Sequence, residues 1–317
     1  MPSHDLLPGV ITGREPTILI DHISKWYGDI VAVSDVTFGV SQGVTALLGP
    51  NGAGKSTALK MMAGLLSTSS GKISILGSSP RGKTSVYKKI GLVHESEHIY
   101  PYLTGREFVR FNAILQRVKR VDEATDRAIA IVDMAGPSDR KVGGYSKGMR
   151  QRIKVAAALV HDPEVILMDE PLNGMDPAQR AHMINLIREL GETRTVLISS
   201  HVLAEVERFA ENIIVIVNGK LAAAGDFRAI RDKIDSHDHA VRIRSNEPRW
   251  LAVALIGHES TRSVRMDRDN RIIAETVDVR SFYKALPLLA KRANVRLLDV
   301  QPADDSLTSV FAYLVER

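Results

Sequence analysis

The chain has 317 residues, of which 44% are hydrophobic and 25% charged, with a net charge of +5 and no cysteine. This composition fits one large folded domain or two ordinary ones, and it excludes disulfide and thiolate chemistry. The apolar runs 155–160 and 213–217 are far shorter than the roughly 20 residues that span a bilayer, and the N-terminus lacks a secretory signal pattern. A basic excess of this size is usually a solvated surface, so we expect no nucleic-acid partner.

After an N-terminal tail at 1–16, residues 17–228 have the pattern of an α/β domain. Segments 17–23 and 36–40 predict strands, and 81–160 is mostly helical in pattern. The continuous apolar runs 164–171 and 194–201 predict strands buried on both faces of a parallel sheet. Residues 213–225 hold Asn218-Gly219 between two apolar runs, which predicts a β-hairpin.

The pattern changes after residue 228. Residues 229–240 predict a linker, and residues 241–317 predict a small α+β accessory domain of order βαββαβ, which is the ferredoxin-like order. Pro287 lies inside the second predicted helix, where a proline weakens helical continuity. No glycine-rich unit repeats, so we expect one nucleotide site per chain.

The stretch GPNGAGKS at 49–56 matches G-x-x-x-x-G-K-[ST] and stands between a short apolar run and a helix pattern. Glycines let backbone N–H groups turn toward a polyphosphate, and the helix N-terminus favours an anion. Lys55 is expected to reach the β- and γ-phosphates, and the Ser56 hydroxyl to bind Mg²⁺. The motif predicts a nucleotide site without choosing among kinase, GTPase and ATPase.

The stretch VILMDE at 165–170 narrows that choice. The four apolar residues 165–168 predict a strand with Asp169 at its C-terminal end, where the carboxylate can hold Mg²⁺ through water. Glu170 beside it can polarise an attacking water molecule. An acidic pair at a strand end is common by itself. In a chain that also has a phosphate-binding glycine-rich loop (P-loop) at 49–56, the pair indicates that the nucleotide is hydrolysed.

The stretch GGYSKGMRQR at 143–152 predicts a turn followed by a helix whose buried face begins at Met149. Ser146 and Gly148 would stand at the helix N-terminus, where free N–H groups and a hydroxyl form an anion site. One P-loop and a second phosphate-binding helix end in a single chain suggest that two chains share each nucleotide.

Over residues 17–228, these motifs resemble the ATP-binding subunits of ABC transporters. The resemblance implies a RecA-like core, a helical subdomain and an antiparallel β subdomain. It implies Glu170 and His201 as catalytic residues, and Ser56, Glu95 and Asp169 as Mg²⁺ ligands. It further implies ATP contacts from Tyr27 (stacked on adenine), Asn51, Gly52, Ala53, Gly54, Lys55, Ser56 and Thr57, from Tyr145, Ser146, Lys147 and Gly148 of the neighbouring subunit's signature loop, and from Asp176 of the D-loop at the dimer seam.

Two departures from the family pattern stand out. The signature loop, commonly LSGGQ, is YSKGM here, and the Q-loop position carries Glu95 instead of glutamine, a change that makes this position sensitive to charge and pH. Lys147 is expected either to face the partner's nucleotide, ordered only in a closed dimer, or to be a solvated lysine. With residues 100–107 and 305–317, these features resemble the branch that exports drugs, antibiotics and lipids.

The resemblance therefore implies an exporter ATPase that uses ATP and Mg²⁺ and forms a homodimer at the cytoplasmic face of the cell membrane. Its membrane contact would pass only through a separate permease. Two alternatives are a soluble ABC ATPase acting on ribosomes or nucleic acid and an importer ATPase. The chain has a single cassette and no coiled-coil pattern, which disfavours the soluble ATPase. Its C-terminal region has the order βαββαβ and not the pattern of a β-barrel, which disfavours the importer ATPase. The accessory domain could instead be a binding module for dimerisation or regulation.

The stretch HESEH at 94–98 formally fits the zinc-protease motif H-E-x-x-H. That motif requires a helix that places both histidines on one face, whereas these residues follow the strand-like segment 90–93. The pair His237 and His239 in the polar linker is a weaker candidate still. We therefore expect no zinc site.

Overall fold

The computed structural model describes residues 16–81, 84–95, 99–226, 230 and 239–303. These residues form two compact units, one containing 16–226 and the other 239–303. No helix within the described ranges is long and apolar enough to cross a bilayer.

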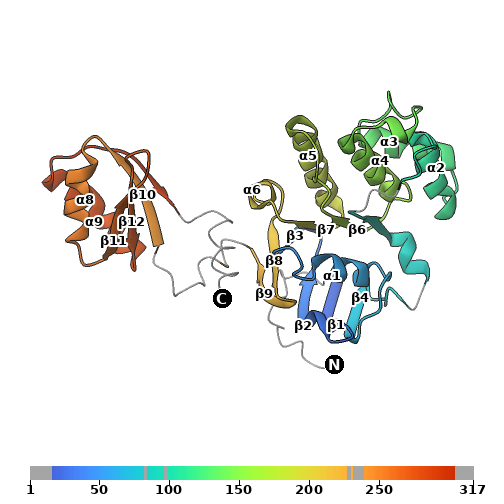
Figure 1. The fold of residues 1–317 in the computed structure, drawn as a ribbon, viewed down its shortest axis with the longest axis horizontal. Coiled ribbons are helices and arrows are strands. Elements are labelled where there is room, and N and C mark those ends of the chain that lie inside the picture. Colours follow the sequence, from blue (N-terminus) through green and yellow to red (C-terminus); the bar gives the residue numbers. More distant parts are fainter. Residues whose placement is uncertain (1–15, 82–83, 96–98, 227–229, 231–238, 304–317) are drawn as a thin grey trace. The chain divides into compact units, whose positions relative to one another are not determined.

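A six-stranded sheet of order β5-β6-β7-β3-β8-β9 organises the first unit (Figure 1). Its first five strands are parallel and the last is antiparallel; they are β5 (Ile90–Val93), β6 (Val165–Asp169), β7 (Thr195–Ser200), β3 (Gly43–Leu48), β8 (Asn212–Val217) and β9 (Lys220–Gly225). Every residue of β6 and β7 is buried, as their continuous apolar runs predicted. Asn218 and Gly219 both adopt positive φ between β8 and β9, which confirms the predicted hairpin.

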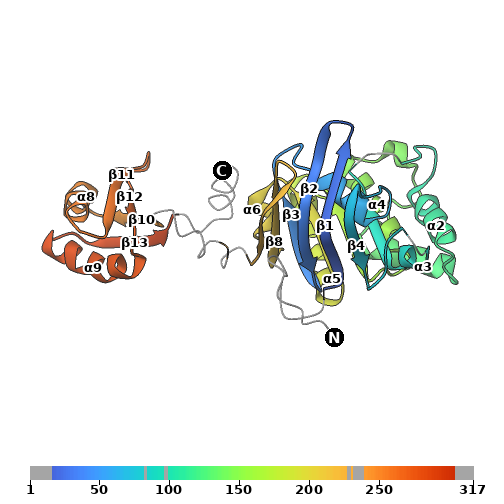
Figure 2. The same cartoon turned by 90° about the horizontal axis from the view of Figure 1, so that it is seen from below.

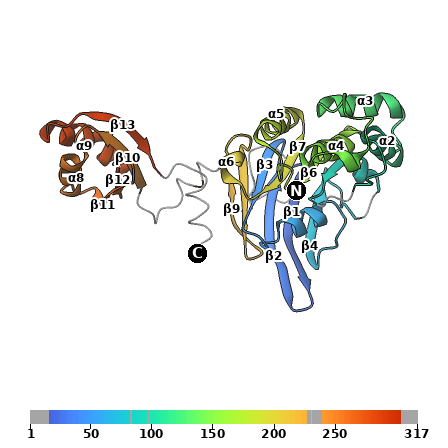
Figure 3. The ribbon, with the colours of Figure 1, turned by 45° about the horizontal axis from the view of Figure 1, so that its top comes forward.

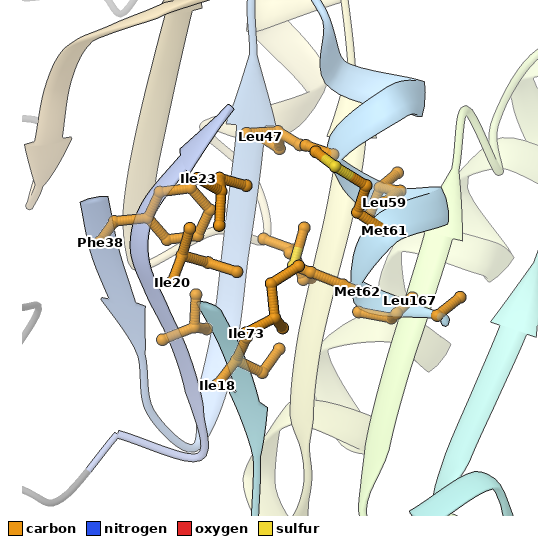
Figure 4. Packing of buried hydrophobic residues seen from close by; sticks show 14 of the residues in the cluster. Ile18, Ile20, Ile23, Phe38, Leu47, Leu59, Met61, Met62, Ile73 and Leu167 are labelled. Carbon is orange, nitrogen blue, oxygen red and sulfur yellow. The ribbon is translucent and has the colours of Figure 1, made fainter. Parts of the chain in front are cut away.

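A second, antiparallel sheet of order β2-β1-β4 comprises β2 (Ile30–Val40), β1 (Ile18–Tyr27) and β4 (Ser70–Ile75). Helix α1 (Lys55–Met62) packs between the two sheets, where Leu59 and Met62 belong to the same buried cluster as Ile20 and Phe38 (Figure 4). The predicted strands 17–23 and 36–40 are therefore present but longer than expected, and β4 was not predicted. The pairing of β1 with β2 shifts register three times, and such bulges interrupt the alternation by which a strand is recognised.

Three helices cluster beside the sheets as a helical subdomain: α2 (Gly105–Leu115), α3 (Val121–Ile131) and α4 (Lys147–Leu159) (Figure 3). Two 3-10 turns lie in the same stretch of the chain, η1 (Thr84–Lys89) and η2 (Val142–Gly144). Residues 81–160 are less helical than predicted, because β5 and the turns at 132–141 lie between the helices. Thr104 and Glu107 form a reciprocal capping box that starts α2. Helix α5 (Pro177–Thr193) covers the other face of the six-stranded sheet from α1, and α6 (Leu203–Val206) follows β7.

The second unit consists of β10 (His239–Ser245), α8 (Pro248–Ile256), β11 (Thr261–Met266), β12 (Ile272–Thr276), α9 (Val279–Arg292) and β13 (Leu297–Pro302). Its antiparallel sheet has the order β11-β12-β10-β13. Both helices cover the same face of that sheet, because Leu251 of α8 and Phe282 of α9 share one buried cluster with Val241 and Ile243 of β10 (Figure 2). Helix α9 runs unbroken through Pro287.

Candidate functional site

The glycine-rich loop lies between β3 and α1, where two glycines let the backbone pass close to neighbouring strands. A Cβ at Gly49 would collide with the carbonyl of Ile216 in β8, and one at Gly54 with the carbonyl of Ala32 in β2. Gly54 is the N-cap of α1, with a φ of 104° that strongly favours glycine. The loop is thus held at the N-terminus of α1, as the motif predicted.

A pocket of about 570 Å³ opens over this loop, a volume within the usual range of ligand sites. Its lining includes all seven predicted loop residues together with Glu95, Glu170 and His201. The full lining is Ala32, Asn51, Gly52, Ala53, Gly54, Lys55, Ser56, Thr57, Glu95, Glu170, Asn173 and His201. The structure therefore brings together residues from five segments that are far apart in the sequence.

Lys55 is buried in this pocket. Its Nζ donates hydrogen bonds to the carbonyls of Gly49 at 2.8 Å and Pro50 at 3.1 Å. Burial lowers the pKa of Lys55, and the nearby charges of Glu170 and Asp169 oppose that shift. A phosphate would offer this ammonium group a stronger, charged acceptor than the loop carbonyls do.

Asp169 is buried beneath the pocket and accepts two hydrogen bonds on one carboxylate oxygen. The Ser56 hydroxyl donates to Oδ1 at 3.1 Å, and the Ser199 hydroxyl donates to the same atom at 2.6 Å. Ser199 also accepts from the backbone N–H of Glu170 at 2.9 Å. The adjoining hydroxyl and carboxylate oxygens are the ligand types that Mg²⁺ prefers, so this donor set fits that ion.

Ser199 was missed in the sequence. A polar pair, Ser199-Ser200, ends an otherwise apolar strand directly before His201, and this pattern was a signal for a functional residue. The sequence could not show that this hydroxyl points across the sheet to the neighbouring strand β6.

Glu170 follows β6 directly and adopts a φ of 49°, a left-handed conformation that is uncommon for a residue with a side chain. Its Oε2 lies 2.8 Å from Nδ1 of His201, which follows β7. Burial raises the pKa of Glu170, while the hydrogen bond and charge of His201 and the charge of Lys55 act in the opposite direction. This carboxylate is therefore held in place and is more basic than an exposed glutamate.

Helix α4 begins at Lys147, and Ser146 is its N-cap, accepting from the backbone N–H of Met149 at 3.2 Å. The predicted helix start at Ser146 is confirmed. The side chain of Tyr145 is buried, and its hydroxyl donates to the carbonyl of Pro137 at 2.7 Å. Burial also raises the pKa of Tyr145. The side chain of Tyr145 is thus packed within the helical subdomain, and only the backbone of this residue remains available for a nucleotide contact.

The side chain of Lys147 lies over Gly174, because a Cβ added to that glycine would collide with its Cδ, Cε and Nζ. Together with Glu95, Glu170 and Asn173, it borders a small cavity of about 90 Å³. Lys147 is therefore placed against its own chain, beside Glu170. Lys147 also remains exposed, and its expected contact with a partner's nucleotide stays a prediction.

Asp176 caps α5 by accepting from the backbone N–H of Gln179 at 2.9 Å. The Gln179 amide packs directly on Gly148, so the residues around Asp176 contact the start of α4. Arg180 extends this connection, because its guanidinium donates to the carbonyl of Met175 and pairs at 2.6 Å with the buried carboxylate of Glu205. Neither partner of this ion pair was singled out in the sequence.

Tyr27 lies at the end of β1, half exposed, with Nζ of Lys25 5.2 Å from its ring centroid. It does not belong to the lining of the pocket over the glycine-rich loop. Its predicted stacking on adenine stays a prediction.

His94 and Glu95 of the HESEH stretch lie outside any helix, and His98 lies outside the described residues. His239 begins β10, whereas His237 is also outside the described residues. Within the described part of the chain, no cluster of three or more His, Asp or Glu side chains is arranged to hold a metal ion.

Comparisons with known proteins identify the family of this chain. A family model described as ABC transporter matches residues 33–173. The linearmycin resistance ATP-binding protein LnrL of Bacillus subtilis (strain 168) is 31% identical over 306 residues, which cover 94% of this chain and 97% of that protein. The bacitracin transport ATP-binding protein BcrA of Bacillus licheniformis is 37% identical over 203 residues, covering 63% and 66% of the two chains.

Solved structures share the fold of the first unit. An ATP-binding subunit of an ABC transporter is 27% identical, with a TM-score of 0.63 over 68% of this chain and 92% of its own. The dimeric post-hydrolysis state of the cassette MJ0796, bound to ADP and Pi, is 22% identical, with a TM-score of 0.61 over 66% and 98% of the two chains. The predicted P-loop ABC ATPase fold is confirmed, and the chain therefore belongs to the ATP-hydrolysing, ATP-binding subunits of ABC transporters.

Proposed function

We propose that this chain is the ATPase subunit of an exporter and works in pairs, each ATP lying between the P-loop of one subunit and Ser146 and Gly148 of the other. One observation carries the pairing: the pocket contains the P-loop, Glu170 and His201, but not Ser146, Gly148 or Asp176. A second copy could supply these groups. The dimeric cassette of similar fold and the resistance and transport proteins among the relatives support this proposal.

In this proposal, Ser56, Asp169 and Glu95 would hold Mg²⁺, which neutralises phosphate charge when bound. Lys55 binds the β- and γ-phosphates, and Tyr27 stacks on the adenine. Glu170 accepts a proton from the attacking water, and the hydrogen bond from His201 fixes the orientation of its carboxylate. These residues all lie in the proposed ATPase domain at 17–228, which a linker at 229–240 joins to an accessory domain at 241–317.

The permease is proposed to contact a groove of about 490 Å³ between α1, β5, α2 and α4. Its lining combines apolar side chains such as Leu65 and Phe108 with the polar ends of Asn112 and Lys154. Lys154 donates to the carbonyl of Glu95, so the groove adjoins the nucleotide pocket. Such a contact would hold the subunit at the cytoplasmic face of the cell membrane.

Purification of the tagged chain from membranes of its host tests the transporter role. We expect a polytopic membrane protein to co-purify, and Mg·ATP to convert the purified monomer into a dimer during gel filtration. Recovery with ribosomes and without a membrane protein would instead support a soluble ABC ATPase. The direction of transport is tested by accumulation of bacitracin-like or linearmycin-like compounds in cells with and without the gene, where a higher level in wild-type cells contradicts export.

Ser199→Ala is expected to lower kcat for ATP hydrolysis by about 10- to 100-fold, as loss of a group that orients a ligand residue typically does. The hydroxyl bridges the Asp169 carboxylate and the Glu170 backbone, and alanine removes both hydrogen bonds. Steady-state phosphate release measures the effect. Ser138→Ala removes another buried hydroxyl, in the helical subdomain, and should leave kcat unchanged. Equal rates in the two variants would show that Ser199 does not position the site.

The pH profile of kcat is expected to fall on the acid side at a pH above the ordinary pKa of a glutamate. Glu170 must be ionised to accept a proton, and burial raises its pKa, so activity is present above this raised pKa and is lost as the pH falls through it. His201→Gln removes an interaction that lowers this pKa, and the acid limb should then move to higher pH. An acid limb unmoved by this substitution would contradict the assignment.

Lys147→Ala is expected to weaken ATP-driven dimerisation severalfold while leaving ATP binding intact. The substitution removes the side chain that packs on Gly174 and connects the start of α4 to the D-loop. Analytical ultracentrifugation with and without ATP measures dimerisation, and Lys141→Ala, at an exposed position nearby, is the control. Identical dimerisation of the two variants would leave Lys147 without a role at the interface.

A further inference from the structure

The positive charge of the chain is concentrated in the second unit. Residues 239–303 contain ten arginines and two lysines but only seven aspartates and glutamates, an excess of five that equals the net +5 of the whole protein. The rest of the chain is therefore balanced. The excess of positive charge is therefore not scattered over the surface of the protein, as the composition first indicated.

Apart from the exposed Arg249, helix α8 is apolar on its outer side as well as its inner side. Leu251 and Leu255 are buried against the sheet, whereas Trp250 and Val253 are each 67% exposed and Ile256 is 52% exposed. A surface helix normally turns polar residues toward water. The outer side of α8 thus has the composition of a surface that contacts something other than water.

Helix α9 carries a row of cations on its outer side. Arg280, Lys284, Leu288 and Lys291 follow one another at helical spacing, opposite the buried Phe282, Leu286 and Ala290. The three cations are exposed, and Leu288 is 61% exposed. No aspartate or glutamate occurs in either helix.

Because α8 and α9 contact each other on the same face of the sheet, their outer sides form one surface (Figure 2). We call it the helical face; it consists of the exposed residues of α8 and α9 named above. The nearest acidic neighbours in sequence, Glu247 and Asp278, stand at the helix N-caps, and Asp278 is engaged there with Ser281. Lys284 also lies close enough to Asp278 to help lower the pKa of that carboxyl, after the larger effect of Ser281. The helical face therefore combines an excess of cations with exposed tryptophan and aliphatic side chains.

We propose that the helical face lies on the anionic surface of a lipid membrane. Tryptophan and aliphatic side chains enter the boundary between headgroups and acyl chains, while long cationic side chains reach the phosphates. A protein interface is usually depleted of lysine, and nucleic acid does not select for exposed aliphatic residues. In this proposal the contact is additional to the permease, whereas the family resemblance implied membrane contact only through that partner.

Vesicle binding by the full-length chain tests this proposal independently of nucleotide, dimerisation and transport direction. In the Trp26→Phe background, Trp250 is the sole tryptophan. We expect co-sedimentation with vesicles of phosphatidylcholine and phosphatidylglycerol, accompanied by a blue shift of Trp250 emission and weakened by salt. Vesicles of phosphatidylcholine alone should bind much less protein.

Lys284→Glu combined with Lys291→Glu should reduce binding to the mixed vesicles by more than about tenfold, since each cation near an anionic surface contributes about a fivefold factor. The matched control, Arg265→Glu combined with Arg268→Glu, changes net charge equally at exposed positions outside the two helices and should retain most of the binding. If charge reversal unfolds the second unit, Lys284→Gln combined with Lys291→Gln provides the same comparison without added negative charge.

Absence of binding to the mixed vesicles would overturn the proposal. So would an equal loss of binding in the helix and control variants, which would reveal attraction by net charge alone. A helix variant that changes the oligomeric state but keeps full vesicle binding would assign the helical face to a second copy of the chain. In each case the ATPase rate and the pairing at the nucleotide site are measured separately and remain interpretable.

Discussion

Glu170→Gln is expected to lower kcat for ATP hydrolysis by about 10²- to 10⁴-fold, the usual contribution of a positioned general base. Glutamine keeps the shape of the side chain and can still bond to His201, but it cannot accept a proton from water. Burial has raised the pKa of this carboxylate, which makes it a stronger base than an exposed glutamate would be. ATP binding should persist, because the P-loop is untouched, and the ATP-bound dimer should accumulate.

Single-turnover hydrolysis and gel filtration with ATP measure these two consequences. Glu189→Gln, the same chemical change on the exposed side of α5, should behave like the wild-type chain in both experiments. Wild-type turnover by Glu170→Gln would remove Glu170 from the catalytic role and leave its left-handed backbone conformation without a functional reason.

Lys55→Ala is expected to weaken ATP binding by about a hundredfold or more, as loss of a buried charge-assisted interaction typically does. The Lys55 ammonium group is the cation of the P-loop pocket, and loop carbonyls already hold it in position for a phosphate. Titration with a fluorescent ATP analogue measures the loss, and hydrolysis should fall with it.

Lys72→Ala removes an exposed lysine of β4 and should leave the affinity for ATP unchanged. Thermal unfolding distinguishes a damaged site from a damaged fold. The side chain of Lys55 bonds to its own loop, so some loss of stability is expected, but a variant that unfolds before ATP is added is uninformative about binding. Lys55→Arg, which keeps the charge, should then retain part of the affinity that Lys55→Ala loses.

The parts of the site that the sequence predicted are those that depend on neighbours along the chain. A run of apolar residues ends at Asp169, and a serine followed by a helical pattern identifies the N-cap Ser146. The antiparallel sheet was predicted incompletely, because bulges in β1 disrupt the alternation that identifies a strand. Pro287 did not interrupt α9, where tertiary packing of Phe282 and Leu286 outweighs the local cost of a proline.

The sequence by itself thus determined the P-loop and the hairpin at Asn218-Gly219, since short-range backbone requirements of glycine, serine and apolar runs define both. The order and spacing of its motifs carried the resemblance to the family. Only the tertiary structure decided that Ser199 bridges Asp169 to Glu170 and that Lys147 lies over Gly174. It also decided that the exposed residues of α8 and α9 share one surface. Each of these depends on which segments pack together, and that pairing is decided by burial over the whole domain rather than by local pattern.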